Sequence, residues 1–246
     1  MRIIISPAKK MKVDTDTFPV EGTPVFLEKT RILAQLMADM DYQELKTLWR
    51  CNDKLARQNY DRIRCMDLTR SLTPAIIAYE GLQYQHMSPM VFTDKALAYI
   101  GEHLRILSGF YGILSPFDGV VPYRLEMQAP LAVEGAGDLY EFWGSLLYEA
   151  VWDQDRILLN LASREYSRAI EQYLKPGDKL VTCVFGQLEG GRVKQKGTLA
   201  KMARGEMVRF LAENDISDLE GVKAFSALGY RFSKELSDEK KMVFVI

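Results

Sequence analysis

The stretch GFYGILSPFDGVVPYRLEM, residues 109–127, places charged side chains among glycines, prolines and aromatic residues. Asp118, Arg124 and Glu126 supply two carboxylates and a guanidinium, groups that can perform acid–base chemistry or hold Mg²⁺. If the segment is extended, Arg124 and Glu126 lie on the same face, because alternate residues of an extended chain point the same way. The same residues are also typical of a buried ion-pair network that closes a turn. Both interpretations stay open on these residues alone.

Two other segments concentrate positive charge. Residues 192–209 contain six basic residues and one acidic residue, and residues 46–64 contain six basic residues and two acidic ones. The whole chain carries a net charge of only −1, so the remainder is strongly acidic. Such segregated charge lets one face attract phosphate while the molecule as a whole stays near neutral.

The first basic segment predicts a hairpin followed by a helix. Lys194 and Lys196 alternate with Val193 and Gln195, which would place both lysines on one side of a strand. Lys201 and Arg204 follow in a helix that begins near Gly197–Thr198. Free amides and the dipole at a helix N-terminus favour an anion, so these cations could converge on a phosphate. The alternative is an ordinary solvated charged face.

The second basic segment predicts a helical hairpin over residues 41–65. Asp41 and Glu44 have the spacing of a capping box, and Asp53 follows the expected turn at Cys51–Asn52. Lys54 and Arg57 would then lie at the start of the second helix. A hairpin tip of this kind can grip the DNA backbone without reading bases. An ordinary pair of packed helices is the alternative.

The elements that must position these residues mix helices and strands irregularly. Strands are expected at RIIIS (2–6), 74–85, 156–163, 179–187 and the C-terminal tail, with helices at 25–40, 93–109, 138–152, 163–174 and 198–214. The hairpin signal Glu189–Gly190–Gly191 joins two further strand-like runs. No linker or repeat divides the chain. We therefore expect a single compact α+β domain over residues 1–246, with a mixed sheet surrounded by helices.

Composition excludes several classes of function. Three cysteines and two histidines, without metal-ligand spacing, argue against a disulfide framework, a structural metal or a bound metal cofactor. No nucleotide-binding or hydrolase motif is present, so we expect a binding protein without a cofactor, and no catalytic residue is assigned. No apolar run is long enough to span a bilayer, and no signal-like segment begins the chain. These features predict a cytoplasmic protein with no membrane partner.

Six stretches together resemble one known family. They are ISPAK (5–9), NDKLA (52–56), HLRILSGFYGILSPFDGVVPYRLEM (103–127), DLYEFWG (138–144), NLASREY (160–166) and AKMARGEMVRF (200–210). In this order they resemble the YaaA family of peroxide stress resistance proteins, formerly a family of unknown function, and they cover almost the whole chain.

The resemblance implies a compact mixed α/β fold with a positively charged cleft and a helix-hairpin-helix element. It further implies binding of duplex or branched DNA without sequence preference, protection from hydrogen peroxide and a link to DNA repair. The expected DNA-contacting cations are Lys9, Lys54, Arg57, Arg105, Arg124, Lys194, Lys196, Lys201 and Arg204, with Asp118 and Glu126 as a polar cluster in the cleft. The alternative is a metal-dependent enzyme acting on nucleic acid or a nucleotide through Asp118, Arg124 and Glu126.

Overall fold

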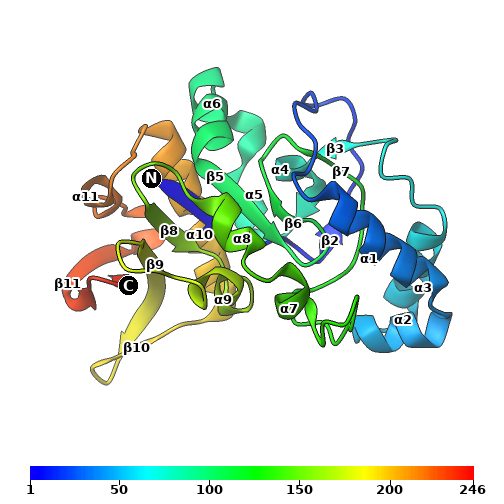
Figure 1. Ribbon diagram of the computed structural model, residues 1–246. Coiled ribbons are helices and arrows are strands. Elements are labelled where there is room, and N and C mark those ends of the chain that lie inside the picture. The colour runs from blue at the N-terminus through cyan, green and yellow to red at the C-terminus, as the bar shows by residue number, and fades with distance from the viewer.

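A computed structural model describes residues 1–246 and is built on an eight-stranded mixed sheet (Figure 1). Seven strands follow the order β11-β12-β9-β8-β1-β5-β6, and β10 pairs with the carboxyl-terminal end of β9. Their bounds are β1 Arg2–Ile5, β5 Leu104–Ser108, β6 Gly112–Leu114, β8 Ile157–Leu161, β9 Lys179–Glu189, β10 Arg192–Lys194, β11 Arg231–Asp238 and β12 Lys241–Val245. Two small ribbons lie outside the sheet: β2 (Lys10–Met11) with β4 (Tyr79–Glu80), and β3 (Thr73–Pro74) with β7 (Gly119–Val120).

The centre of the sheet is parallel and buried on both faces. β1 pairs in parallel with β5 on one side and with β8 on the other, and β8 continues in parallel to β9. Ile3, Ile4 and Ile5 are all fully buried, so this strand lacks the alternation of a half-exposed strand. A continuous apolar run is what a strand covered by helices on both faces requires.

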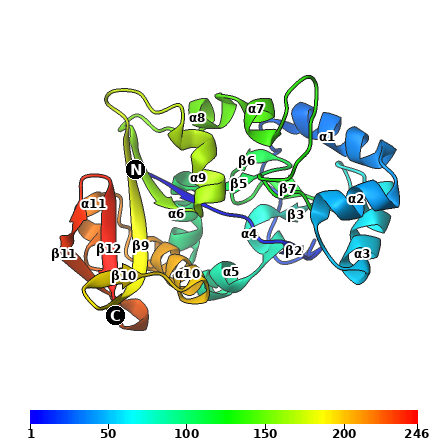
Figure 2. The same ribbon diagram turned by 90° about the horizontal axis from the view of Figure 1, so that it is seen from below.

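Helices cover both faces of this sheet. Figure 2 shows α8 and α9 on one side of the strands and α5 and α10 on the other, while α1, α2 and α3 gather at one end. The helices are α1 Leu27–Asp39, α2 Tyr42–Trp49, α3 Asp53–Arg64, α4 Ala75–Ala78, α5 Leu82–Met87, α6 Asp94–His103, α7 Leu139–Trp143, α8 Leu146–Val151, α9 Arg164–Glu171, α10 Gly197–Glu213 and α11 Leu219–Val222, with 3₁₀ turns η1 Pro89–Val91 and η2 Ala227–Gly229. None of them combines the length and apolar character that crossing a bilayer requires.

The α+β class and the mixed sheet are confirmed, whereas three predicted elements are wrong. Residues 74–85 are not one strand but the end of β3, then α4, β4 and the start of α5. The helix expected over 93–109 ends at His103, and residues 104–108 form β5 because they pair with β1 in the core. The helix expected over 138–152 is broken into α7 and α8 at Gly144, which has a positive φ of 51°.

The predicted hairpin over 41–65 consists of α2 and α3, joined by the turn Arg50–Asn52. Asp41 and Glu44 form the capping box in both directions, which fixes the start of α2. No glycine lies at the tip, and Arg50 takes the left-handed conformation there with φ 44°. The second helix begins at Asp53, and Asn52 caps it by accepting a hydrogen bond from the Leu55 amide. The helix-hairpin-helix role of this pair in DNA binding stays a prediction.

Candidate functional site

A cavity of about 390 Å³ lies outside the carboxyl ends of the neighbouring parallel strands β1 and β8. In the sheet, β1 lies between β5 and β8. The chain that leaves β1 returns to the sheet at β5, whereas the chain that leaves β8 returns on the opposite side, at β9, so the two connections run in opposite directions. In open α/β sheets, ligands bind at such a switch point, outside the carboxyl ends of the strands. The cavity is lined by Ser6, Pro7, Ala8, Lys9, Lys10, Glu80, Gly81, Leu82, Gln83, Tyr84, Tyr123, Arg124, Leu125, Glu126, Ser163, Glu165, Tyr166, Lys201 and Arg204.

Glu126 forms an ionic cluster with two cations in this cavity. Its Oε1 atom lies 3.1 Å from Lys9 Nζ and 3.1 Å from Arg124 Nη2. The Arg124 and Glu126 side chains are only 9% and 12% exposed, whereas Lys9 is largely exposed. Neither contact is a well-directed hydrogen bond, because Glu126 Oε1 has no hydrogen-bond partner. Arg124 Nε, which takes part in neither contact, is also buried without a partner. The arrangement holds one guanidinium in the cavity wall through Coulomb attraction.

The glycine-rich stretch positions this cluster. A Cβ atom at Gly109 would lie 2.6 Å from the Leu125 carbonyl oxygen, so only glycine lets the backbone of residues 125–127 pack here. Tyr123, Leu125 and Met127 are buried, whereas Arg124 and Glu126, which alternate with them, are partly exposed and pair with each other. The Tyr123 hydroxyl is held 2.7 Å from Ser108 Oγ. The predicted alternation along this extended segment is therefore confirmed.

The helix α10 supplies two further cations, Lys201 and Arg204. A Cβ atom at Gly205 would lie 2.1 Å from the Gln83 carbonyl oxygen, so this glycine lets α10 and α5 touch through their backbones. Gln83 is 7% exposed, and its Nε2 atom has no partner. Arg204 Nε is also buried without a partner, and burial lowers the pKa of this guanidinium. Arg204 therefore lies against the cavity instead of on an opposite, solvated face of the helix.

The loops after β1 and β8 close the other side of the cavity. The Ser163 amide donates to Ser6 Oγ at 2.8 Å, and the Tyr84 hydroxyl donates to the Ser6 carbonyl at 2.9 Å. Glu165 follows Ser163 and accepts a hydrogen bond from the Gln128 amide at 3.4 Å. Burial, reinforced by the nearby Glu126 carboxylate, raises the pKa of Glu165.

Asp118, the other residue of the expected polar cluster, lies outside this cavity, so the expectation that Asp118 and Glu126 share one site is wrong. Asp118 lines a separate cavity with Arg105 and accepts a hydrogen bond from the Ser115 amide at 2.8 Å. Burial raises the pKa of the Asp118 carboxyl. Asp118, Arg124 and Glu126 therefore do not form one catalytic constellation. No group of three or more His, Cys, Asp or Glu residues is arranged to hold a metal ion.

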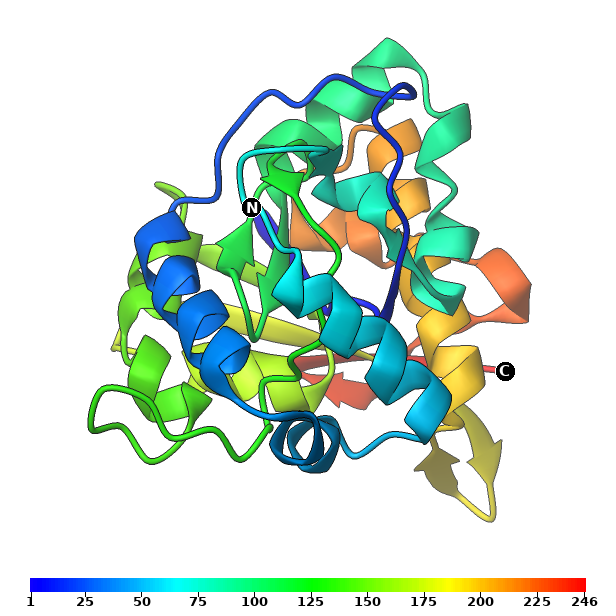
Figure 3. The ribbon, with the colours of Figure 1, turned by 90° about the vertical axis from the view of Figure 1, so that its right-hand side faces the viewer.

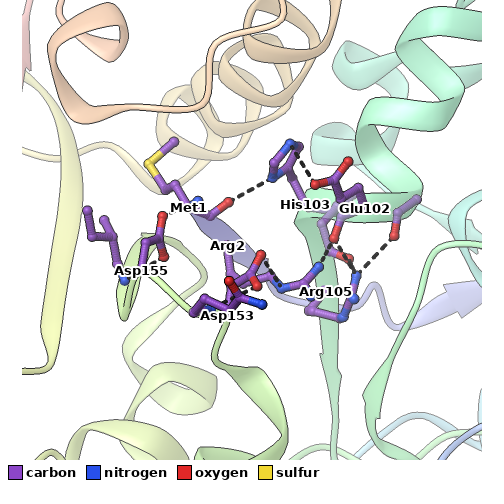
Figure 4. Close-up of polar contacts among 11 residues, drawn as sticks. Met1, Arg2, Glu102, His103, Arg105, Asp153 and Asp155 are labelled. Carbon is purple, nitrogen blue, oxygen red and sulfur yellow. Dashed lines mark hydrogen bonds and ion pairs between the residues drawn. The ribbon is translucent and has the colours of Figure 1, made fainter.

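Arg105 belongs to a polar cluster at the amino ends of β1 and β5 (Figure 4). Its Nη1 atom donates to the carbonyls of Gly101, Glu102 and Leu104, at 3.1, 3.2 and 2.6 Å. Arg2 lies beside it and pairs with Asp153 at 3.6 Å. Burial, followed by repulsion from Arg2, lowers the pKa of Arg105 to about 10. The Arg105 guanidinium thus donates hydrogen bonds to carbonyl groups at the carboxyl end of α6. This position is at the opposite end of β5 from the cavity that contains Arg124.

The remaining predicted cations lie on elements that flank the cavity. The hairpin α2–α3 touches it, because Arg124 Nη2 lies 3.5 Å from the Trp49 carbonyl oxygen at the end of α2. Lys54 and Arg57 are exposed on α3, and Arg57 stacks 4.7 Å over the Tyr42 ring. Figure 3 shows the β9–β10 hairpin beside the start of α10. Lys194 on β10 pairs with Glu189 at 2.8 Å, and Lys196 is exposed just before α10.

Gln83, Glu165, Ser6 and Tyr84 are site residues that the sequence reasoning did not select. Ser6 and Glu165 had a usable signal, because each follows a short buried apolar run that reads as a parallel strand. Gln83 and Tyr84 had none, since residues 74–85 resemble a strand and gave no indication of α5.

Residues 1–236 match the family of the peroxide stress protein YaaA. A UPF0246 protein of Pediococcus pentosaceus is 52% identical over 245 residues, which is 100% of this chain and 98% of the relative. UPF0246 proteins of Agathobacter rectalis and Lactiplantibacillus plantarum are 53% and 51% identical, covering 99% and 100% of this chain and 98% and 99% of the relatives.

The chain belongs to the YaaA family. Membership of this family of peroxide stress proteins supports a role in peroxide stress. The cavity of this YaaA-family protein includes residues from four of the six sequence stretches that resemble the family: ISPAK, residues 103–127, NLASREY and residues 200–210.

Proposed function

We propose that this YaaA-family protein acts in peroxide stress by binding DNA, duplex or branched, through phosphate contacts without sequence preference. One observation carries the proposal. Lys9, Arg124, Lys201 and Arg204, which are far apart in the sequence, line a single cavity. Their common role would be the neutralisation of backbone phosphates, which supplies affinity but no sequence information.

The flanking elements extend this positive surface beyond the cavity. Lys54 and Arg57 are exposed on α3, whose hairpin contacts Arg124 through Trp49. Lys196 precedes α10, whose first turn has no side-chain cap, so its amides are free to meet a phosphate. A DNA backbone that runs from α3 to the start of α10 would meet the cavity between them.

The proposal is tested with a fluorescent DNA duplex and the variant Lys201→Glu. Lys201 is exposed and forms no ion pair, so its replacement leaves the core packing intact. The wild-type affinity is expected to fall steeply with salt, and loss of one phosphate contact lowers the log–log slope by about 0.9. Lys201→Glu should therefore weaken binding and flatten that slope.

The matched control is Lys234→Glu, an equal charge change on an exposed residue of β11 away from the cavity. It should leave the salt slope close to the wild-type value. A wild-type affinity that does not respond to salt, or an equal effect of the two variants, contradicts the proposal.

A further inference from the structure

We propose that the switch-point cavity binds the phosphate monoester of a nucleotide, with Arg204 and Lys201 meeting its two negative charges. The ligand chemistry has two possible sources, a terminal phosphate at a DNA strand end or a free nucleoside monophosphate. The first source rests on the proposed DNA binding, whereas the second does not.

The pairing of charges in the cavity identifies the two cations. Lys10 is paired with Glu80 at 3.0 Å, and Lys9 and Arg124 share Glu126. Lys201 and Arg204 form no ion pair, although both line the cavity from successive turns of α10. Over the whole lining, five cations (Lys9, Lys10, Arg124, Lys201 and Arg204) face three carboxylates (Glu80, Glu126 and Glu165). The cavity therefore has a net charge of +2, which calls for a ligand with close to two negative charges.

Arg204 makes the stronger demand for an anion because its guanidinium is partly withdrawn from solvent, with Nε fully buried and without a partner. A buried charge without a partner is costly, and proteins normally pair it. Cys183 is the ionisable group whose charge would favour the Arg204 cation, but burial raises the pKa of that thiol to about 12, so the thiol stays neutral. An anion in the cavity supplies the compensating charge.

The unpartnered hydrogen-bonding groups agree with an acceptor-rich ligand. Arg204 Nε, Arg124 Nε and Gln83 Nε2 are buried, line the cavity and lack any acceptor. All three can only donate. Gln83 is more than nine-tenths buried, so water does not satisfy its amide as it would at the surface. Phosphate oxygens accept several hydrogen bonds at once and match this set.

Size and charge distinguish a monoester from the continuous DNA backbone. A volume of about 390 Å³ lies within the range of small-molecule sites, and Tyr84, Tyr123 and Tyr166 contribute aromatic wall to it. A hollow of this size accommodates one nucleotide inside it, whereas an uninterrupted duplex can meet only the cations at its rim. A phosphate monoester carries about −1.5 to −2 charges at pH 7, whereas each backbone diester carries about one.

The test compares labelled duplexes that differ at a single nick. The nick carries a 5′-phosphate, a 3′-phosphate or only hydroxyl groups, and an intact duplex of the same sequence is the reference. In parallel, calorimetry measures binding of thymidine 5′-monophosphate and of thymidine. At least one phosphorylated probe should bind about tenfold more tightly than its hydroxyl counterpart, because hydrogen bonds to charged groups contribute that much.

Arg204→Gln and Lys201→Gln should each reduce this phosphate-to-hydroxyl ratio toward one, while Lys234→Gln should leave it unchanged. Lys201 and Arg204 also belong to the proposed DNA-binding surface, so their replacement can weaken binding of every duplex. The ratio of affinities for phosphorylated and hydroxyl probes removes this common effect and is therefore the quantity compared. Lys201 is exposed, so its variant keeps the test valid if Arg204→Gln fails to fold.

The outcomes separate the two proposals. A preference only for thymidine 5′-monophosphate over thymidine supports the inference and assigns the free nucleotide as its source. A phosphate preference without binding of the intact duplex supports the inference and overturns duplex binding. Equal affinity for every phosphorylated probe and its hydroxyl counterpart overturns the inference, even if the intact duplex binds with the expected salt dependence.

Discussion

At the scale of single residues, the site depends on how one carboxylate is shared. Glu126 is the common partner of Lys9 and Arg124, and the backbone packing at Gly109 positions the segment that carries Arg124 and Glu126. The sequence pattern predicted that Arg124 and Glu126 share a face. It left open whether Asp118 or Glu126 pairs with Arg124, because that choice depends on how the loop folds between them.

Replacing Glu126 by Gln should destabilise the protein. It leaves the buried Arg124 without its counter-charge and close to Lys9, and breaking a buried pair from one side costs about 3 kcal/mol. Urea denaturation measures the free energy of unfolding. The control is Glu28→Gln, which breaks the exposed pair with Arg31 and should cost less than about 0.5 kcal/mol. Equal losses in the two variants would show that the Glu126 cluster is not stabilising.

Glu165 should make anion binding depend on pH. Its raised folded pKa means that it takes up a proton above the pH at which an unperturbed Glu would, so the cavity loses a negative charge as pH falls. Affinity for a DNA duplex should therefore rise as pH falls through the raised pKa of Glu165, while ionisation of Glu165 above that pKa lowers the stability of the fold.

The variant Glu165→Gln isolates the effect of this carboxyl from that of other charged groups near the cavity, such as the His86–Glu206 pair between α5 and α10. It should bind the duplex a few-fold more tightly near neutral pH and show a flatter pH profile, measured by fluorescence anisotropy. If the duplex affinity of Glu165→Gln changes with pH as steeply as that of the wild type, the pH dependence comes from other groups.

At the scale of elements, the crossing of α5 and α10 builds half of the cavity. Gly205 lets the two backbones touch, and this contact places Gln83 of α5 beside Arg204 of α10. The sequence predicted α10 and its isolated glycine, but α5 was hidden in a stretch that resembles a strand. Likewise, β5 continues without a break from α6, because tertiary pairing with β1 overrides the helical pattern of residues 104–108.

Alanine favours helices more than glycine does, so a Gly→Ala replacement inside a helix normally stabilises a protein. Replacing Gly205 by Ala should instead destabilise this fold. The new methyl group would overlap the Gln83 carbonyl, forcing the helices apart at a cost of about 2–3 kcal/mol. Thermal and urea denaturation measure the loss. Gly197→Ala is the matched control at the start of the same helix, where nothing lies within 4 Å of the added Cβ, and it should change stability by less than about 1 kcal/mol. A Gly205→Ala variant as stable as the control contradicts a tight crossing.

At the scale of the whole molecule, topology decides which charges meet. Lys9 follows β1, Arg124 follows the β6–β7 region and Lys201 lies on α10, so their convergence depends on the strand order around β1. The charge distribution along the sequence indicated the basic segments but not their arrangement. For the same reason it grouped Arg105 with Arg124, although β5 carries Arg105 at its amino end and the chain reaches the cavity only beyond its carboxyl end.

The direct backbone contact at Gly205 also bears on the speed of recognition. Because α5 and α10 are fixed against each other, Gln83 and Arg204 are held in position before any ligand arrives. A rigid site loses little conformational entropy on binding. Encounter should then be governed by long-range attraction between the cations and the approaching anion, so that added salt slows association far more than it hastens dissociation.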